Sequence, residues 1–504
     1  MTDYQQLRHT AQRFARGAKT QGAFWGYAMV NSHGRRDRRG RPTTPDMSGS
    51  PAGLKEGAIP FAMAVRVWLK ISLLSFGGPA GQIAVMHRLV VTEMKWVSER
   101  RFLHALNFCM LLPGPEAQQL TIYLGWLLHR VRGGFVAGIL FVLPGAIAML
   151  ALSMIYVTYQ NAAVLESVFV GVKATVLAIV LSALYRLGRR LLHRPVLLAI
   201  AVGAFVCSFI LSVPFPMVIV LAGLAGIIFR IRPDQDDPPG PDDHKDADPV
   251  HAASPAPHDL STRRVVTVLA ICGAIWLVPV IALYAMLGGG HIYAQQSLFF
   301  SQMAVVTFGG AYAVLSYMAE QTVNYYGWLT GGEMLDGLGL AETTPGPLIM
   351  VTQFVGFIGA YRNPGALDPM LAGTLGALVA SWVTFAPCFL WIFLGAPYIE
   401  KLRGNAVLAR VLSCITAAVV GVILNLTVWF GVQVLFTELR PVPIAFSAAQ
   451  TGTVALPVLE SFDPLVGAMM VTALLAITVF RIGMIKVLLC SAAFGLAAGT
   501  AGLI

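Results

Sequence analysis

The sequence predicts an all-α polytopic membrane protein with two inverted-topology repeats, broken or re-entrant half-helices and roughly 11–14 membrane segments. Three observations support this fold class. Hydrophobic residues make up 56% of the 504 residues and charged residues only 12%, whereas about a quarter of the residues in a soluble domain are charged. Long apolar stretches, such as Gly133 to Tyr159 and Val265 to Leu287, reach the ~20 residues that cross a bilayer as a helix. Short motifs also recur between the two halves of the chain.

Composition divides the chain into four parts. Residues 1–57 are basic and lack a signal-peptide core, so they predict a disordered cytoplasmic extension. Residues 58–230 form the first repeat. Residues 231–263 are rich in Asp, Pro, Gly and His, and such an acidic, Pro-rich cytoplasmic linker cannot bury enough apolar surface to fold. Residues 264–504 then supply a connecting helix and the second, inverted repeat.

The repeat is visible as motifs at one constant offset. The following pairs lie 232 residues apart: Phe76-Gly77-Gly78 and Phe308-Gly309-Gly310, Trp96 and Trp328, and Pro113-Gly114-Pro115 and Pro345-Gly346-Pro347. Beyond the last pair an insertion near residues 362–370 shifts the register, so that Pro144 aligns with Pro387. Single Gly or Pro motifs arise by chance, but three at one offset indicate a duplication.

Loop charges predict that the two repeats are inverted. Short cytoplasmic loops carry excess Lys and Arg, which places the turn with Arg130 and Arg132 inside and the uncharged turn at Asn161 outside. The second-half equivalent of the Asn161 turn carries Lys401 and Arg403. Opposite charge at equivalent turns is what inversion requires. The same pattern predicts a cytoplasmic N-terminus and a C-terminus outside.

Two segments of the first half have the composition of helix breaks, Ser75 to Gln82 and Leu112 to Gln119. Non-helical backbone survives at membrane depth only where protein buries it or where it lines a wet cavity. Gly114 permits unusual backbone angles and Pro115 suits the first turn of a new helix. The free N–H groups of such a helix start form a natural anion site. The alternative is that the motifs are kinks and close-packing glycines.

We therefore expect anion binding at both sets of breaks. In the first half, the expected substrate-binding residues are Ser75, Gly77, Gly78, Gln82, Arg88, Pro113, Gly114, Pro115, Gln118 and Gln119. In the second half they are Gly309, Gly310, Thr343, Thr344, Pro345, Gly346 and Pro347.

Charged residues near the breaks suggest two further roles. Glu116 and Glu342 adjoin the Pro-Gly-Pro motifs, and a poorly solvated carboxylate can bind and release a proton during transport. Helix capping is an equally weighted alternative for both acids. Arg66, Lys70 and Arg100 are candidates for charges along the anion path. Snorkelling from a helix end is the alternative for Arg66 and Lys70, and a place in an interfacial charged elbow is the alternative for Arg88 and Arg100.

Several function classes lack support in the sequence. The chain has no Walker A sequence, no GxSxG, no HExxH and no dinucleotide fingerprint, so we expect neither an enzyme nor a cofactor. Its six cysteines are scattered without metal-ligand spacing, which predicts no metal site. The basic residues form no amphipathic face, so nucleic-acid binding is not expected.

The motifs themselves resemble a known family. FGGPAGQIA and LPGPEAQQLTIYLGW in the first half, and FGGAY and TTPGPL in the second, are similar to signatures of the chromate ion transporter (CHR) family, long-chain two-domain type. The resemblance extends over about residues 58–504. The extension and the linker lie outside the matched pattern.

The resemblance implies a secondary active transporter that exports chromate across a bacterial cytoplasmic (inner) membrane, driven by the proton gradient. Sulfate, a structural analogue, is expected to compete. Two alternatives stay open: a transporter that takes up sulfate or another oxyanion, and a membrane anion sensor without turnover. The expected partners are a chromate- or sulfate-like oxyanion, protons and the lipid bilayer, and a homodimer is also left open.

Overall fold

The computed structural model describes residues 59–159, 162–191, 193–211, 213–228, 262–308, 311–398, 406–447 and 450–502. The expected extension 1–57, residues 231–261 of the expected linker, and the two glycines Gly309 and Gly310 lie outside the described residues. The four-part division of the chain therefore stays a prediction.

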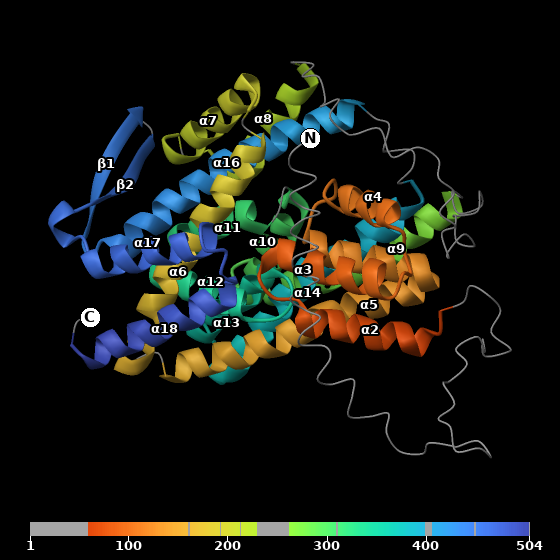
Figure 1. Cartoon of the computed structure of the whole chain (residues 1–504), viewed down its shortest axis with the longest axis horizontal. Coiled ribbons are helices and arrows are strands. Elements are labelled where there is room, and N and C mark those ends of the chain that lie inside the picture. The colour runs from red at the N-terminus through yellow and green to blue at the C-terminus, as the bar shows by residue number, and fades with distance from the viewer. Residues whose placement is uncertain are drawn as a thin grey trace, which may run out of the picture. The chain divides into compact units, whose positions relative to one another are not determined.

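Helices make up most of the described chain (Figure 1). The first half contains α2 (Phe61–Leu74), α3 (Gly78–Met86), the π-helical turn η1 (His87–Glu93), α4 (Glu99–Cys109), α5 (Glu116–Tyr159), α6 (Ala163–Leu191), α7 (Pro195–Phe209) and α8 (Phe215–Ile228). The second contains α9 (Thr262–Leu287), α10 (Ile292–Val306), α11 (Ala311–Ala319), the π-helical η4 (Glu320–Tyr325), α12 (Gly331–Thr343), the 3₁₀ turn η5 (Leu348–Met350), α13 (Val351–Arg362), α14 (Pro369–Gly395), the 3₁₀ turn η6 (Ala396–Tyr398), α16 (Ala406–Leu435), the strands β1 (Leu439–Ser447) and β2 (Gln450–Pro457), the 3₁₀ turn η7 (Leu459–Ser461), α17 (Pro464–Thr478) and α18 (Met484–Thr500).

The two halves follow one plan. In each, a helix ends just before the predicted Phe-Gly-Gly motif, a short helix after the motif continues into a π-helical turn, and a half-helix leads to the Pro-Gly-Pro motif. The paired π-helical turns η1 and η4 extend the repeat beyond its sequence motifs, since their sequences HRLVVTE and EQTVNY share little. The predicted helical class with two repeats and broken helices is confirmed.

Capping chemistry sets several helix starts. Asp368 accepts hydrogen bonds from two backbone N–H groups of α14, and Pro369 occupies the first turn. Asp463 and Pro464 repeat this arrangement at α17. An acidic side chain here bonds otherwise unpaired N–H groups, and proline has no N–H to satisfy.

Helix α5 is two antiparallel limbs joined by a tight turn. The helical angles fail at His129 and at Arg130, whose φ is 54°. A Cβ added to Gly125 would collide with the backbone of Gly133, and one added to Gly133 would collide with Gly125. In a straight helix these residues would lie about 12 Å apart along the axis, so the limbs fold back at the predicted arginine-bearing turn.

The terminal helix pairs of the two halves are exchanged. In the first half, α7 and α8 pack on α16 of the second half, and α17 and α18 of the second half pack on α6 of the first (Figure 1). Glycines bring the backbones close: a Cβ on Gly421 would strike Ala201, and one on Gly171 would strike Ser491. Each half therefore completes its packing with the other.

A β-hairpin departs from the otherwise helical plan. Strands β1 and β2 pair antiparallel, from Leu439 opposite Pro457 to Ser447 opposite Gln450, with one irregularity near the turn. The hairpin stands between α16 and α17, where the first half has the short arginine-rich connection between α6 and α7. It adds a two-stranded element to the all-α class that the sequence predicts.

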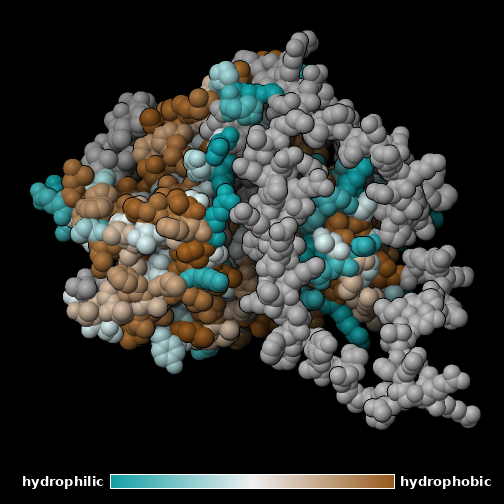
Figure 2. Space-filling view, in the orientation of Figure 1, coloured by the Kyte–Doolittle hydropathy of each residue, from teal (hydrophilic) through white to brown (hydrophobic). Residues whose placement is uncertain are grey.

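The surface matches a membrane environment. Among the described residues, five helices are long and apolar enough to cross a membrane by length and composition: Glu116–Tyr159, Val164–Arg189, Thr262–Leu287, Pro369–Gly395 and Val407–Leu435. Large apolar side chains such as Ile147, Ile228 and Met286 are exposed, and Figure 2 shows apolar residues over much of the described surface. A soluble monomer rarely exposes such patches, so these helices identify a multi-pass membrane protein.

Candidate functional site

The helix breaks of the two halves are hydrogen-bonded to each other. The Gly346 N–H donates to the carbonyl oxygen of Ser75 at 2.8 Å, and the Gly114 N–H donates to that of Thr307, also at 2.8 Å. Ser75 is the repeat equivalent of Thr307, and Gly114 that of Gly346. Two equivalent bonds running in opposite directions define an approximate two-fold relation, and they bring all the predicted breaks that the structure describes into one region.

The first break frees the start of α3. Ser75 Oγ donates to the Ile71 carbonyl at 2.7 Å, which ends α2 with a buried hydroxyl. Gly77 and Gly78 then take φ values of 81° and 70°, which favour glycine. No side chain caps α3, and a Cβ on Gly77 would meet nothing within 4 Å. A helix N-terminus without a cap and with open space beside it can accommodate an anion.

The second break carries the amides predicted as donors. Gly114 has a φ of 121°, and α5 begins at Glu116, directly after Pro115. Gln119 Nε2 donates to the Pro113 carbonyl at 2.6 Å, so this amide holds the break itself. Gln118 is fully buried, and neither of its amide atoms has a hydrogen-bond partner among the described residues. Buried amides are normally bonded, so Gln118 is available to a polar ligand.

Gln82 joins the first half to the second. It is buried, and its Nε2 donates to the carbonyl of Gly346 at 2.5 Å. The side chain therefore spans from α3 to the opposite Pro-Gly-Pro break. The amide oxygen of Gln82 has no partner among the described residues.

The second-half break differs in its side chains. The hydroxyls of Thr343 and Thr344 donate back to the carbonyls of Leu340 and Ala341 in α12, at 2.7 and 3.1 Å. Because these protons are used within α12, the threonines offer an anion no free hydroxyl donor in this arrangement. Gly346 has a φ of 95°, and Pro347 precedes the 3₁₀ turn that opens α13.

The two predicted acids have different surroundings. Glu116 lies half-buried in the first turn of α5. Glu342 is buried in α12, where its Oε1 accepts a hydrogen bond of 2.7 Å from the hydroxyl of Tyr312. That hydroxyl also adjoins the first break, since it would lie 3.8 Å from a Cβ on Gly78.

Sequence reasoning missed Tyr312. The signal was present, because Tyr312 follows the second Phe-Gly-Gly motif at the position where the first half has Ala80. Because Tyr312 is a residue that differs between the halves, it was not singled out by a comparison that looked for shared residues.

The predicted path charges lie on the outside of the first half. Arg66, Lys70, Arg88 and Arg100 are all exposed. The Lys70 ammonium lies 4.0 Å and Arg88 Nε 3.5 Å from the carboxylate of Glu93. The structure thus places these four cations on a surface and brings none of them into the buried region of the breaks. Binding of the anion by Arg88, and a path along the other three, stay predictions.

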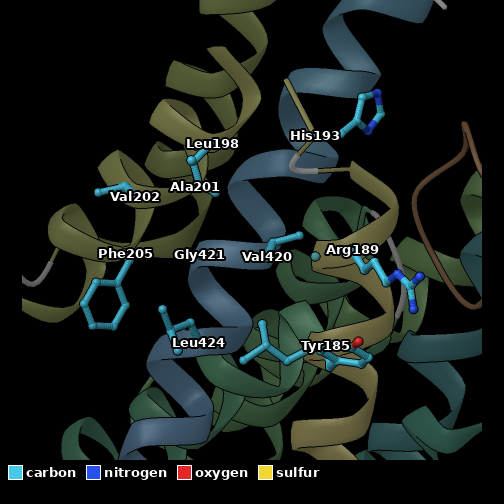
Figure 3. Close-up of a pocket in the computed structure, with 12 residues that line it drawn as sticks. Tyr185, Arg189, His193, Leu198, Ala201, Val202, Phe205, Val420, Gly421 and Leu424 are labelled. Carbon is cyan, nitrogen blue, oxygen red and sulfur yellow. The ribbon is translucent and has the colours of Figure 1, made fainter. Parts of the chain in front are cut away.

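One pocket lies away from the breaks. Figure 3 shows a pocket of about 530 Å³ among α6, α7 and α16. Apolar side chains, including the exposed Val202 and Leu424, form most of its lining, and Tyr185, Arg189 and His193 are its polar members. An apolar groove suits acyl chains better than a hydrophilic anion, so we do not assign it to the substrate.

The described residues hold no group of three or more His, Cys, Asp and Glu side chains that could bind a metal. Their six cysteines are free thiols. The chemistry on offer at the breaks is thus that of backbone N–H groups, side-chain amides and the Glu342–Tyr312 pair.

Comparison with known proteins identifies the family. The chain is 30% identical over 360 residues to a chromate transport protein of Pseudomonas aeruginosa, covering 71% of this chain and 77% of that protein. It is 28% identical over 372 residues to a probable chromate transport protein of Synechococcus elongatus, covering 73% and 84%. It is 26% identical over 427 residues to a chromate transport protein of Cupriavidus metallidurans, covering 85% and 96%.

No solved structure gives a significant match. A sequence model of the family described as chromate transporter matches residues 63–227 and 294–496, which include the breaks of both halves. The chain belongs to the chromate transporter family.

Proposed function

We propose that the protein exports chromate from the cytoplasm as a secondary active transporter, and that the inward proton gradient drives the export. The observation that carries the proposal is the reciprocal pair of hydrogen bonds, Gly346 to Ser75 and Gly114 to Thr307. Through these bonds, broken helices from both halves meet in one buried region. In repeat-built transporters, substrate sites lie where such broken helices meet.

The proposed anion site lies beside the starts of α3 and α5. A tetrahedral dianion needs several donors that approach it from different directions. Uncapped N–H groups at Gly78 and a free amide at Gln118 support this role, because helix N-termini carry partial positive charge and point their N–H groups at an anion. Gly77 leaves room for the backbone to approach a ligand closely.

Movement of the two halves against each other would expose the site to either side in turn. The exchanged helix pairs and the reciprocal bonds both support an approximate two-fold relation. The loop charges support an axis in the membrane plane, because the first-half turn at Asn161 is uncharged whereas its second-half equivalent carries Lys401 and Arg403. Inverted repeats with such an axis commonly work by rocking one repeat against the other.

Proton coupling is proposed to involve Glu342. Its Oε2 has no partner among the described residues, while Tyr312 bonds its Oε1. An ionised carboxylate in the membrane is costly unless it is fully paired, so binding a proton relieves part of that cost. Glu116 is the second proposed coupling residue, at the first turn of α5.

Purified protein in sealed vesicles tests the proposal. We expect labelled chromate to accumulate against its concentration gradient when a pH gradient is imposed, and accumulation to stop when an ionophore collapses that gradient. Equal movement with and without the gradient would remove proton coupling. The sign of the gradient that drives accumulation gives the direction of net transport.

Competition defines the substrate. Sulfate and chromate are both tetrahedral dianions, and the donors at the breaks are not specific to either. We expect unlabelled sulfate to compete weakly with chromate. Stronger transport of sulfate than of chromate would favour the uptake alternative, whereas binding of chromate without any flux would favour a sensor.

A further inference from the structure

A second buried ionisable cluster lies away from the breaks, where α12 packs on α5 and α6. Asp336 of α12 is only 5% exposed. Its Oδ2 accepts a hydrogen bond of 2.9 Å from the hydroxyl of Tyr156 in α5, and its Oδ1 lies 3.3 Å from the ammonium of Lys173 in α6. The ion pair thus joins the first half, through α6, to a half-helix of the second.

The surroundings of this cluster are mostly apolar. Tyr156 stacks edge-on against Phe169 and Phe354, and a Cβ on Gly339 would strike Val172. Lys173 itself lies inside a candidate membrane span, Val164–Arg189. Ionisable residues at such depth are rare and are typically found along ion or proton pathways.

The charged groups around Asp336 are few. Lys173 and Tyr156 face Asp336 from α6 and α5. The carboxylate of Glu333, in the first turn of α12, repels that of Asp336 electrostatically. Glu333 is itself paired with Arg362 of α13 at 2.6 Å. Lys173 is therefore the counter-charge to Asp336, and protonation of the carboxylate would leave that ammonium unpaired.

Lys173 has a route to water if the pair opens. Its side chain is 28% exposed, compared with 7% for that of Asp336. The ammonium would lie 3.6 Å from a Cβ on Gly332, in the first turn of α12. The Lys173 ammonium lies at ion-pair distance from Asp336 Oδ1 but does not form a hydrogen bond with it. Asp336 Oδ1 therefore has no hydrogen-bond donor among the described residues.

Helix α12 leads directly to the second break. Asp336 lies about two helical turns before Thr343, where α12 ends, and Gly346 then bonds to Ser75 of the first half. A change in how α12 is held against α6 therefore acts on the backbone that we place at the anion site.

We propose that Asp336 is a proton-binding coupling residue, and that its ion pair with Lys173 holds α12 on α6 until a proton neutralises the carboxylate. The step forms one O–H bond on Asp336 and breaks the ion pair, with no other change in bonding. The released Lys173 turns toward water, and α12 becomes free to move with the break. This inference rests on the proposed function and assigns part of its proton coupling.

The two halves differ at this point. The repeat equivalent of Asp336 is His104, and that of Lys173 is Thr416. His104 and Thr416 cannot form an equivalent ion pair, because threonine carries no charge, so the proposed coupling acts at one of the two repeat-related contacts between the halves.

The test compares two transport modes in sealed vesicles containing the full-length protein. Counterflow, the exchange of labelled for unlabelled chromate without a pH gradient, needs the anion site but no net proton movement. Accumulation driven by a pH gradient needs the anion site and also net proton movement. The variants are Asp336→Asn and the double variant Asp336→Asn with Lys173→Met, in which no charge is left unpaired. Glu460→Gln, which removes an exposed acid of the same half, is the matched control.

We expect the double variant to keep counterflow within about twofold of the wild type, while gradient-driven accumulation falls at least tenfold. The control should keep both. Normal accumulation by the double variant would overturn the inference and leave the proposed function intact. Wild-type protein that shows counterflow but does not accumulate chromate when a pH gradient is imposed would overturn proton coupling and the inference together. Wild-type protein without any chromate flux would overturn transport itself.

Loss of both modes in the double variant would show that the pair only supports the structure, and would overturn the inference.

Tyr156→Phe provides a second test, which measures the pH dependence of accumulation. If Asp336 binds the proton, loss of the hydroxyl that stabilises its charged form should move the pH of half-maximal accumulation to more alkaline values. An unchanged pH profile would contradict the proposal.

Discussion

The two halves share a backbone plan but differ in the side chains that they bring to it. At the breaks, the first half supplies the amides of Gln82, Gln118 and Gln119. The second half supplies the Tyr312–Glu342 pair. Duplication thus explains the broken helices and their reciprocal hydrogen bonds, while divergence places three amides, suited to an anion, in the first half and a tyrosine-bonded acid, suited to a proton, in the second.

Breaking the shared backbone plan should have the largest effect. Gly114→Ala places a Cβ where φ is 121° and only 2.9 Å from Gln119 Nε2. Such strain costs about 1–3 kcal/mol, and the hydrogen bond to Thr307 is expected to weaken. We expect chromate flux per folded protein to fall at least tenfold, with a similar loss for Gly346→Ala.

A glycine in open space is the control for that pair. Gly203→Ala lies in α7, where an added Cβ would meet nothing within 4 Å. It should leave flux unchanged and slightly raise thermal stability, because alanine favours helix by about 1 kcal/mol. Flux near the wild-type value in Gly114→Ala would mean that this backbone conformation is not needed for transport.

Removing a donor from the first half should separate binding from stability. Gln118→Leu deletes a buried amide without a protein partner among the described residues, so the free energy of unfolding should not fall. A hydrogen bond to a charged group contributes about 1.5–3 kcal/mol, so the half-saturating chromate concentration should rise roughly tenfold or more. Titrations of flux against chromate concentration, with thermal unfolding alongside, measure both quantities.

Gln295→Leu is the matched amide control, since Gln295 bonds to Gly290 at the opposite end of α10 from the break. Its half-saturating concentration should stay within about twofold of the wild type, because an exposed hydrogen bond contributes only about 1 kcal/mol. Unchanged chromate affinity in Gln118→Leu would remove this amide from the anion site.

Removing the hydrogen bond to Glu342, the acid of the second half, should change proton coupling more than chromate affinity. Tyr312→Phe removes the donor to Glu342 Oε1. The expected result is a gradient-driven flux that falls about five- to tenfold, consistent with the net value of about 1 kcal/mol for one buried hydrogen bond, while chromate affinity changes little. Parallel loss of affinity would place Tyr312 at the anion instead.

The exposed cations should matter least. Lys70→Gln breaks a surface contact with Glu93 at 4.0 Å, and such pairs contribute about 0–1 kcal/mol. We expect unfolding temperature and flux to stay close to the wild type. A large fall in flux with unchanged stability would instead support the predicted path along Arg66, Lys70 and Arg100.

The backbone was largely predictable from sequence, because Gly and Pro report backbone conformation directly. The motifs at Gly77, Gly114 and Gly346 mark residues that do adopt positive φ. The turn at Arg130 was predictable because Arg130 and Arg132 are charged residues between two apolar stretches. These signals are local, so the backbone conformation can be predicted from them without knowing which elements pack nearby.

Long-range partners were not predictable. Gln82 reaches Gly346, and Asp336 meets Lys173, across more than 160 residues of chain. Nothing at Lys173 distinguishes a paired from a snorkelling lysine before α6 and α12 are placed side by side. For the same reason the sequence could not predict the exchange of the terminal helix pairs, since apolar helices such as α8 and α18 carry little information about their neighbours.

That exchange of helix pairs has a consequence for biosynthesis. Helix α6 leaves the ribosome almost 300 residues before α18, its packing partner, so at about 5–20 residues per second it waits roughly 15–60 s for the surface that covers it. The final tertiary packing of the first half therefore cannot form before the last helix is inserted. Halves produced as separate chains should in turn reassemble by pairing in trans, since each holds the missing helices of the other.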